Sequence, residues 1–411
     1  MRRMATEADT CRKYVVPKLY EAGWTDEQIS EQVTYTQGRI RVAGGKAKRA
    51  APRRVDYLLR YQRDLPLAVV EAKAEYLAPS EGLQQAMQYG QALDVPFVYA
   101  TNGHGIVEHD FLTGQQRDLE TFPTPLELWN RVRLHKGLGE AVEDKLLTPY
   151  NLQDRVPRYY QSIAINRASE AILRGTPRVL LTLATGTGKT AIAFQIAWRL
   201  WQSRWNVPNE SRRPRILFLA DRDVLVRDPY RKDFAPFGDA RHRIEGGVVN
   251  TSREMYFATY QSIAEDESRP GLYKEYPADF FDLIIVDEAH RGSAAEGGSW
   301  QGILEYYSSA VETRYDRHTA ARRFPRHLHV LRQPRVHSTP SHKAFRTGSL
   351  HRTKCAASSV TPMPPDSVHT LGCATPSGAR FPMVSTARKT SRPPYRSCHA
   401  PKPLPSTSWN T

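Results

Sequence analysis

The feature that most constrains the fold is a glycine-rich segment, Ala-Thr-Gly-Thr-Gly-Lys-Thr at residues 184–190, placed between two apolar stretches. Residues 179–183 before it are apolar enough for a strand covered on both faces, and residues 190–201 after it have helical spacing. Two further apolar runs, at residues 216–220 and 283–286, leave room for helices between them. Strands and helices that alternate in this way predict an α/β domain built on a parallel sheet.

We place this domain at residues 157–311 and predict that its glycine-rich loop binds the phosphates of ATP. The glycines let backbone N–H groups point into one cavity, and the start of the following helix adds positive potential. Lys189 would then reach the β- and γ-phosphates, and Thr190 would bind Mg²⁺. The other predicted nucleotide-binding residues of the loop are Thr185, Gly186, Thr187 and Gly188. A chance glycine turn is the alternative, and the strand, loop and helix context argues against it.

A second motif, Asp-Glu-Ala-His at residues 287–290, follows the last apolar run. A carboxylate at the C-terminal end of a buried parallel strand lies where the ligands of such sheets bind. We predict that Asp287 holds Mg²⁺ through its waters and that Glu288 orients and deprotonates the attacking water. His290 would couple the state of the nucleotide to the rest of the protein. Alone, these four residues could equally begin a helix.

Residues 1–112 predict a smaller α/β domain in which polar residues follow apolar strands. Because side chains alternate along a strand, Glu71 and Lys73 share a face, and Asp56 on the preceding strand could meet them. Two carboxylates and a lysine around one point can hold a divalent metal and polarise a water against a phosphodiester. A surface salt bridge is the more common explanation of such residues. The apolar character of the strand favours a metal site at Asp56 and Glu71.

Three neighbouring features would complete this site. Gln85 and Tyr89 are four residues apart on a predicted helix and therefore share one face. Glu7, on the first predicted helix, is a further candidate metal ligand. A basic run at residues 39–54 precedes Asp56 and could contact phosphates, although such runs are usually solvated loops.

Both halves of the chain resemble a known family, the motor (R) subunits of type I restriction enzymes. Segments similar to the first motor domain of superfamily-two DEAD/DEAH-box helicases are ATGTGKT, ILFLADRD, FATYQSI and IIVDEAHRG. Segments similar to the nuclease domain of the R subunits are LAVVEAKAEY, GLQQAMQYGQAL and PFVYATNGHGIVEHDF, together with the pattern Asp–Glu-x-Lys and Gln-x-x-x-Tyr. The resemblance covers about residues 1–310.

The resemblance implies a restriction-endonuclease-like nuclease domain at residues 1–112, a connector at 113–156 and a RecA-like motor domain at 157–311. Gln161, in Tyr-Tyr-Gln, is placed like the family's adenine-reading glutamine. Thr259 and Gln261 match an element that contacts the nucleic-acid backbone, with an ordinary strand end as an equal alternative.

The implied activity is that of a type I site-specific deoxyribonuclease, which translocates double-stranded DNA with ATP and Mg²⁺ and cuts it. The implied partners are the methyltransferase and specificity subunits of the complex. Two alternatives stay open: an inert, truncated ATP-binding fragment, and a stand-alone helicase–nuclease of another DNA defence or repair system.

Residues 312–411 differ sharply from the rest. They hold 17 Lys and Arg against 3 Asp and Glu, and 13 of the 29 prolines, whereas the first 311 residues hold 41 basic and 40 acidic residues. The net charge of +15 therefore says nothing about DNA binding by the motor. We expect a disordered or frame-shifted tail, and a sheet that lacks the strand due after Val311. A native basic tail is the alternative.

The remaining features concern the compartment. No run of about 18 uncharged apolar residues is present, so no transmembrane helix is expected. The N-terminus lacks the apolar core of a signal peptide. The four cysteines have neither metal-ligand spacing nor a plausible disulfide framework, and a reducing cytoplasm is the expected location.

Overall fold

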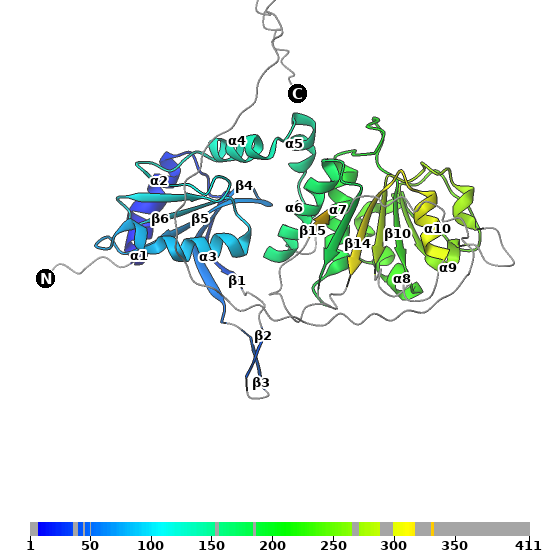
Figure 1. Cartoon of the computed structure of the whole chain (residues 1–411), viewed down its shortest axis with the longest axis horizontal. Helices are drawn as coiled ribbons and strands as arrows, with labels where there is room; N and C mark the ends of the chain where they lie inside the picture. Colours follow the sequence, from blue (N-terminus) through cyan, green and yellow to red (C-terminus); the bar gives the residue numbers. More distant parts are fainter. Residues whose placement is uncertain are drawn as a thin grey trace, which may run out of the picture. The chain divides into compact units, whose positions relative to one another are not determined.

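The structure is a computed structural model, and it describes most of the first 316 residues. The described ranges are 7–35, 40–43, 46–49, 51–152, 156–183, 186–264, 271–287, 299–316 and 330–332. All of them belong to one compact unit, Met1–Thr339. Two main sheets organise this unit (Figure 1). Within the described ranges, none of the helices is both long and apolar enough to cross a membrane.

The N-terminal sheet has six strands in the order β1-β4-β5-β6-β7-β8. The strands are β1 (Ile29–Tyr35), β4 (Arg53–Gln62), β5 (Leu65–Ala72), β6 (Phe97–Thr101), β7 (Ile106–Asp110) and β8 (Gln116–Leu119). Only β5 and β6 pair in parallel, because α3 (Leu83–Leu93) carries the chain across between them; the other neighbours are antiparallel. The two strands predicted to carry Asp56 and Glu71 are confirmed as β4 and β5, and the helix predicted to carry Gln85 and Tyr89 is confirmed as α3.

Helices cover both faces of this sheet. On one face α3 packs with Leu83 and Ala86 against strand residues that include Val69 and Val98. On the other face lie α1 (Glu7–Thr10), a π-helical turn (Cys11–Val15) and α2 (Val16–Glu21), which bury Val15 and Leu19. A 3₁₀ turn (Pro79–Gly82) leads into α3. A separate hairpin is formed by β2 (Ile40–Ala43) and β3 (Lys46–Arg49) within the predicted basic run.

The predicted connector, residues 113–156, contains a strand and helices that were not predicted from the sequence. The sheet extends beyond residue 112, because β8 lies at residues 116–119. Two helices follow, α4 (Pro125–Lys136) and α5 (Glu140–Leu146). The hydroxyl of Thr124 accepts a hydrogen bond from the N–H of Glu127, and Gly137 ends α4 in a left-handed conformation, so both ends of α4 are capped.

The second sheet has seven strands in the order β11-β12-β10-β13-β14-β9-β15, and the predicted parallel arrangement is confirmed for all but the edge strand β15. The strands are β9 (Arg178–Thr182), β10 (Ile216–Ala220), β11 (Arg241–Arg243), β12 (Met255–Thr259), β13 (Leu283–Asp287), β14 (Val311–Asp316) and β15 (Val330–Arg332). The helices are α6 (Tyr159–Leu173), α7 (Lys189–Gln202), α8 (Asp223–Arg231), α9 (Tyr260–Ile263) and α10 (Ser299–Tyr306), with 3₁₀ turns at Ala235–Ala240 and Leu272–Glu275.

Burial on both faces explains why these strands are almost continuously apolar. Phe218 and Ile285 belong to one core cluster, while their neighbours Leu217 and Ile284 belong to another. Side chains that point to opposite faces of β10 and β13 are therefore both removed from water.

The expectation that the sheet lacks a strand after Val311 is wrong. The chain continues as β14 to Asp316, and β14 lies in the interior of the sheet between β13 and β9. Thr313 and Tyr315 are buried, and the carboxylate of Glu312 pairs with Arg178 at 3.2 Å. In β14, Thr313 and Tyr315 alternate with charged residues, and β-branched and aromatic residues favour strands. The strand was not predicted because the composition of the sequence changes sharply here. From residue 317 on, only β15 is described, so the expected tail lies outside the described residues.

Candidate functional sites

The first candidate site forms at the adjoining ends of β4 and β5. Tyr57 pairs with Val70, so Asp56 and Glu71 occupy the next cross-strand positions and share one face of the sheet. The ammonium group of Lys73 donates a hydrogen bond to Oε1 of Glu71 at 3.0 Å. The backbone N–H of Ala72 donates to Oδ2 of Asp56 at 2.9 Å. The structure thus places the three predicted residues of this site together.

Helix α3 completes the cluster from above the sheet. The ammonium group of Lys73 also donates to Oε1 of Gln85 at 3.3 Å, and Nε2 of Gln85 donates to the hydroxyl of Tyr89 at 2.8 Å. Oε1 of Glu7 lies 3.4 Å from the same ammonium group. A Cβ at Gly82 would lie 3.3 Å from Cγ of both Glu71 and Lys73. The absence of a side chain at Gly82 therefore lets the start of α3 approach the cluster closely.

Burial controls the protonation of this cluster. Burial, reinforced by the charge of Asp56 and partly offset by the hydrogen bond from Lys73, raises the pKa of Glu71 to about 7. Burial also raises the pKa of Asp56, although the hydrogen bond from Ala72 opposes the shift. For Lys73, burial favours a lower pKa, but its bonds and proximity to Glu71 and Glu7 outweigh burial and raise the pKa. The lysine is therefore charged, while Glu71 titrates near neutral pH.

One oxygen of the cluster has no bonding partner among the described residues. Oε2 of Glu71 is buried and accepts no hydrogen bond, although a buried polar atom is normally satisfied. A divalent cation that bridges Glu71 and Asp56 would satisfy this oxygen and relieve the repulsion between the carboxylates. Within the described ranges no group of three or more His, Cys, Asp and Glu side chains has metal-site geometry. Protein ligands at this site are thus two carboxylates, and a bound cation would also need waters or backbone oxygens.

The second candidate site lies at the C-terminal edge of the parallel sheet, where β9 leads into α7. Gly186 and Gly188 have φ of 78° and 81°, a region open to glycine and strained for other residues. Lys189 and Thr190 are the first two residues of α7. The backbone amides at the start of this helix and the lysine form the environment that an anionic phosphate requires. Thr185 lies outside the described residues.

Asp287 is the last residue of β13 and is buried at the same edge. β13 and β9 are separated only by β14, and all three are parallel, so the ends of β13 and β9 point the same way. Burial raises the pKa of Tyr260 and of Tyr315, and the negative charge of Asp287 is the second largest cause of both shifts. Glu288 and His290, which follow directly, lie outside the described residues.

The start of α6 contacts the glycine-rich loop. Nε2 of Gln161 and the hydroxyl of Tyr160 both donate to the carbonyl oxygen of Thr187, at 2.9 and 3.2 Å. Oε1 of Gln161 accepts from the N–H of Arg158 at 2.8 Å and so caps α6. A Cβ at Gly188 would lie 2.5 Å from Nε2 of Gln161. Gln161 is thereby fixed beside the loop, on the side where α7 begins.

The strand-end pair Thr259 and Gln261 has a clear local role. The hydroxyl of Thr259 accepts from the N–H of Ser262 at 3.1 Å and caps α9. Gln261 is exposed, and its Nε2 lies 3.4 Å from Oδ1 of Asp221. The cap accounts for the threonine, and the exposed glutamine is accessible to a ligand.

Several residues around these sites were not predicted from the sequence. Gln32, in the middle of β1, has a φ of 52°, and its Nε2 lies 3.4 Å from Oδ1 of Asp56. Residues held in such a conformation cluster at functional sites, but no local sequence signal marks this one. Two ion pairs, Asp64 with Arg199 and Asp94 with Arg167, were also missed. A lone arginine within the apolar run of α7 was the available signal for Arg199.

Comparison with known proteins assigns the two halves of the chain. The family model of the type I restriction enzyme R protein N terminus matches residues 24–123, and that of the type III restriction enzyme res subunit matches residues 154–312. The Type I restriction enzyme EcoAI endonuclease subunit of Escherichia coli is 42% identical over 316 residues, which cover 75% of this chain. The EcoKI endonuclease subunit of Escherichia coli is 30% identical over 271 residues, which cover 59% of this chain.

A solved structure agrees with these matches. A fragment of a putative HsdR subunit of a type I restriction enzyme from Vibrio vulnificus is 50% identical, with a TM-score of 0.65, and the match covers 77% of this chain and 56% of that one. The chain spans 38% of the EcoAI relative and 21% of the EcoKI relative. With an R-protein N-terminal region followed by a helicase-type region, this chain belongs to the family of type I restriction enzyme R subunits.

Proposed function

We propose that this chain supplies the DNA-cutting centre and the first ATP-binding motor domain of a type I restriction enzyme. The observation that carries the proposal is the cluster of Asp56, Glu71 and Lys73, completed by Gln85 and Tyr89 from α3. In the same chain, a helicase-type domain with a phosphate-binding loop follows this cluster. The substrate is double-stranded DNA, and the partners are the methyltransferase and specificity subunits, by analogy with the type I relatives.

The nuclease centre occupies residues 1–112 in this proposal, and Asp56 and Glu71 hold Mg²⁺. When bound, the cation polarises a water and the scissile phosphate. Glu71 must lose its proton to bind the cation, and its buried second oxygen is available for this purpose. Lys73 holds a proton and a positive charge beside Glu71, where it can stabilise an anionic phosphate. Gln85 orients the lysine, and Tyr89 orients Gln85.

The motor domain begins at residue 157, after a connector, and binds ATP with Mg²⁺. Lys189 contacts the β- and γ-phosphates, while Thr190 and Asp287 hold the cation. Gln161 lies next to the loop and reads the adenine. Thr185, Glu288 and His290 have the roles that the sequence motifs assign to them. The basic segment at residues 39–54, which includes the β2–β3 hairpin, contacts the phosphates of DNA near the nuclease centre.

DNA cleavage by the purified chain tests the nuclease assignment. Supercoiled plasmid is incubated with the chain and Mg²⁺ or Mn²⁺, and nicked and linear products are measured. The wild type should cut only with metal, and Glu71→Gln should reduce the rate at least about 100-fold, as expected when a metal ligand is lost. Glu75→Gln, an identical change at a more exposed glutamate that pairs with His104, is the matched control and should cut normally. Equal cleavage by both variants would contradict the assignment.

A further inference from the structure

Two ion pairs connect the elements of the nuclease cluster to the helices of the motor domain. The first, called here the buried pair, joins Asp64 in the turn between β4 and β5 to Arg199 on α7. The second, called the exposed pair, joins Asp94 at the C-terminal end of α3 to Arg167 on α6. The hairpin β4–β5 carries Asp56 and Glu71, and α3 carries Gln85 and Tyr89. Both helices of the motor domain begin at the candidate nucleotide site.

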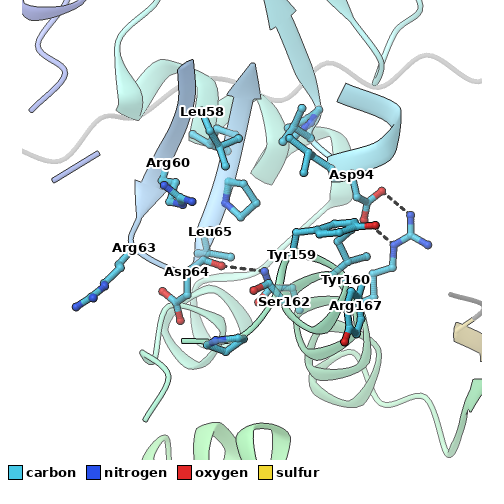
Figure 2. A pocket seen from close by; sticks show the side chains of 18 of the residues that line it. Leu58, Arg60, Arg63, Asp64, Leu65, Asp94, Tyr159, Tyr160, Ser162 and Arg167 are labelled. Carbon is cyan, nitrogen blue, oxygen red and sulfur yellow. Dashed lines mark hydrogen bonds and ion pairs between the residues drawn. The ribbon is translucent and has the colours of Figure 1, made fainter. Parts of the chain in front are cut away.

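An open cavity separates the two domains between these connections. It has a volume of about 1000 Å³, and its lining includes Leu58, Asp64, Asp94, Tyr159 and Arg167. In Figure 2 the hairpin with Asp64 lies on one side of the cavity and α6 on the other, and the exposed pair crosses at its edge. Apolar side chains also join the hairpin to the motor helices, because Leu65 and Ile165 belong to one core cluster, and the two ion pairs add polar contacts at the edge of the open space.

The buried pair is held from several directions. The side chains of Arg199 and Asp64 are 0% and 5% exposed, and Nη2 of the arginine lies 2.8 Å from Oδ2 of the aspartate. The same guanidinium donates to the carbonyl oxygen of Thr148 and to Oδ1 of Asn166, each at 2.9 Å. Nδ2 of Asn166 in turn donates to the backbone carbonyl of Asp64 at 2.9 Å. The guanidinium thus fixes the hairpin turn, the connector and α6 relative to α7.

Helix α7 connects this network directly to the nucleotide site. It begins at Lys189 and Thr190 and reaches Arg199 about 15 Å further along its axis, at 1.5 Å per residue. One turn before Arg199, Gln195 bonds both the N–H and the carbonyl of Asn151, at 2.9 and 2.6 Å. A movement of the start of α7 therefore moves Arg199 as part of one rigid helix.

A buried ion pair transmits such a movement better than apolar packing does. Apolar surfaces can slide past each other at small cost, as in shear motions of packed helices. Charges 2.8 Å apart on two buried side chains cannot separate without exposing an unpaired charge to a low-dielectric surrounding. The hairpin turn must follow the arginine, and the strands of the hairpin carry Asp56 and Glu71 near their far ends.

We propose that the buried pair couples nucleotide binding to the nuclease centre, with Asp64 and Arg199 as positioning residues. Occupancy of the phosphate loop shifts α7, and the pair passes this shift along β4 and β5 to the two carboxylates. This inference rests on the proposed function, because it requires both sites. The exposed pair, with side chains 46% and 35% exposed, is screened by water and contributes little to the coupling.

Hydrogen exchange of the intact chain tests the coupling. Exchange is compared between Mg²⁺ alone and Mg²⁺ with AMP-PNP, so that any effect of the metal on the carboxylates cancels. In the wild type the nucleotide should slow exchange in residues 186–195 and, by about fivefold or more, in residues 55–72, as expected for a typical coupling between sites. Asp64→Asn should keep the slowing at residues 186–195 and lose that at residues 55–72. Asp94→Asn is the matched control and should keep both.

The outcomes separate the inference from the proposed function. Slowing at residues 186–195 alone in the wild type, or slowing at residues 55–72 that survives Asp64→Asn, overturns the coupling and leaves the nucleotide site intact. No nucleotide binding at all overturns the proposed function itself. Should Asp64→Asn fail to fold, Arg199→Lys is the second variant, since it keeps the charge but cannot make the three contacts together. It should weaken the slowing at residues 55–72, and unchanged slowing there would also overturn the coupling.

Discussion

The cluster around Asp56 and Glu71, which we propose as the nuclease centre, and the proposed nucleotide site at the glycine-rich loop are built by different means. The first gathers ionisable side chains from two strands and a helix, and burial changes their protonation. The second uses backbone: two glycines in left-handed conformations and the first turn of α7. The described loop residues of the nucleotide site, 186–188, include no ionisable side chain. The cluster, in contrast, contains Glu71, whose pKa is about 7.

This difference predicts how each region responds to change. Phosphate binding at a helix terminus depends on backbone shape and on the charge of one lysine, so it should be insensitive to pH near neutrality. Metal binding by buried carboxylates depends on their deprotonation, so it should weaken as the pH falls. Each of the following predictions tests one region while the ligand of the other is absent, so that the difference between the two sites is measured without the proposed coupling.

The largest expected effect is loss of nucleotide binding in Lys189→Ala. Removing a charged hydrogen-bond donor from a phosphate site costs about 3 kcal/mol, or roughly 100-fold in affinity. Equilibrium binding of a fluorescent ATP analogue measures the change. Mn²⁺ binding at the carboxylates should stay within about twofold of the wild type. A parallel loss at both sites would mean that the variant has damaged the fold.

The next effect concerns stability, and its sign follows from the pKa of Glu71. The folded protein raises this pKa from 4.5 to about 7, so ionisation of Glu71 penalises the folded state. Stability from this group is complete below pH 4.5 and falls as the pH rises towards 7. At ~1.4 kcal/mol per pH unit, the penalty above pH 7 is on the order of 3–4 kcal/mol.

Glu71→Gln removes that penalty. In metal-free buffer the variant should therefore be more stable than the wild type at pH 8 and close to it at pH 4, as measured by urea unfolding. Asp282→Asn offers a contrast: this buried aspartate is held at 2.6 Å by Arg212, so its loss should destabilise the protein at pH 8. A Glu71→Gln protein less stable than the wild type at pH 8 would contradict the account.

Much of the fold was predictable because its signals are local. The spacing of apolar residues and the Gly and Pro residues beside them predict strands β10 and β13. They also predict the helices after the glycine-rich loop and after Pro79. The predicted site residues Asp56, Glu71 and Lys73 also meet, since strand alternation fixes which side chains share a face.

The rest depends on contacts between distant segments. Asp64 and Arg199 are 135 residues apart, and nothing near either one indicates the partner. Strand β14 was not predicted because the sequence becomes basic and rich in proline from residue 312. This change outweighed the short alternation of Thr313 and Tyr315 with charged residues. Gln32 has a left-handed conformation between two residues, Glu31 and Val33, that pair with the distant strand β4. Local sequence gives neither the partner of Asp64 nor the conformation of Gln32.

The smallest expected effects come from two glycines, one at each site. Gly188→Ala places a side chain on a left-handed residue, which costs about 1–2 kcal/mol, and crowds Gln161. Gly82→Ala meets Glu71 and Lys73 at 3.3 Å in an ordinary helical conformation and should cost about 1 kcal/mol. Gly139→Ala enters open space and is the control. Thermal unfolding with either ligand should show site-selective losses, and equal losses at all three glycines would break the comparison.

The pH dependence of Mn²⁺ binding shows whether Asp56 and Glu71 form one metal site. The Mn²⁺ affinity of the nucleotide-free chain is measured by electron paramagnetic resonance between pH 5.5 and 8.5, for the wild type and for Glu71→Gln. We predict one site whose affinity falls about tenfold per pH unit below pH 7, where Glu71 takes up a proton, and which Glu71→Gln abolishes. Binding that is independent of pH, or that persists in Glu71→Gln, would contradict it.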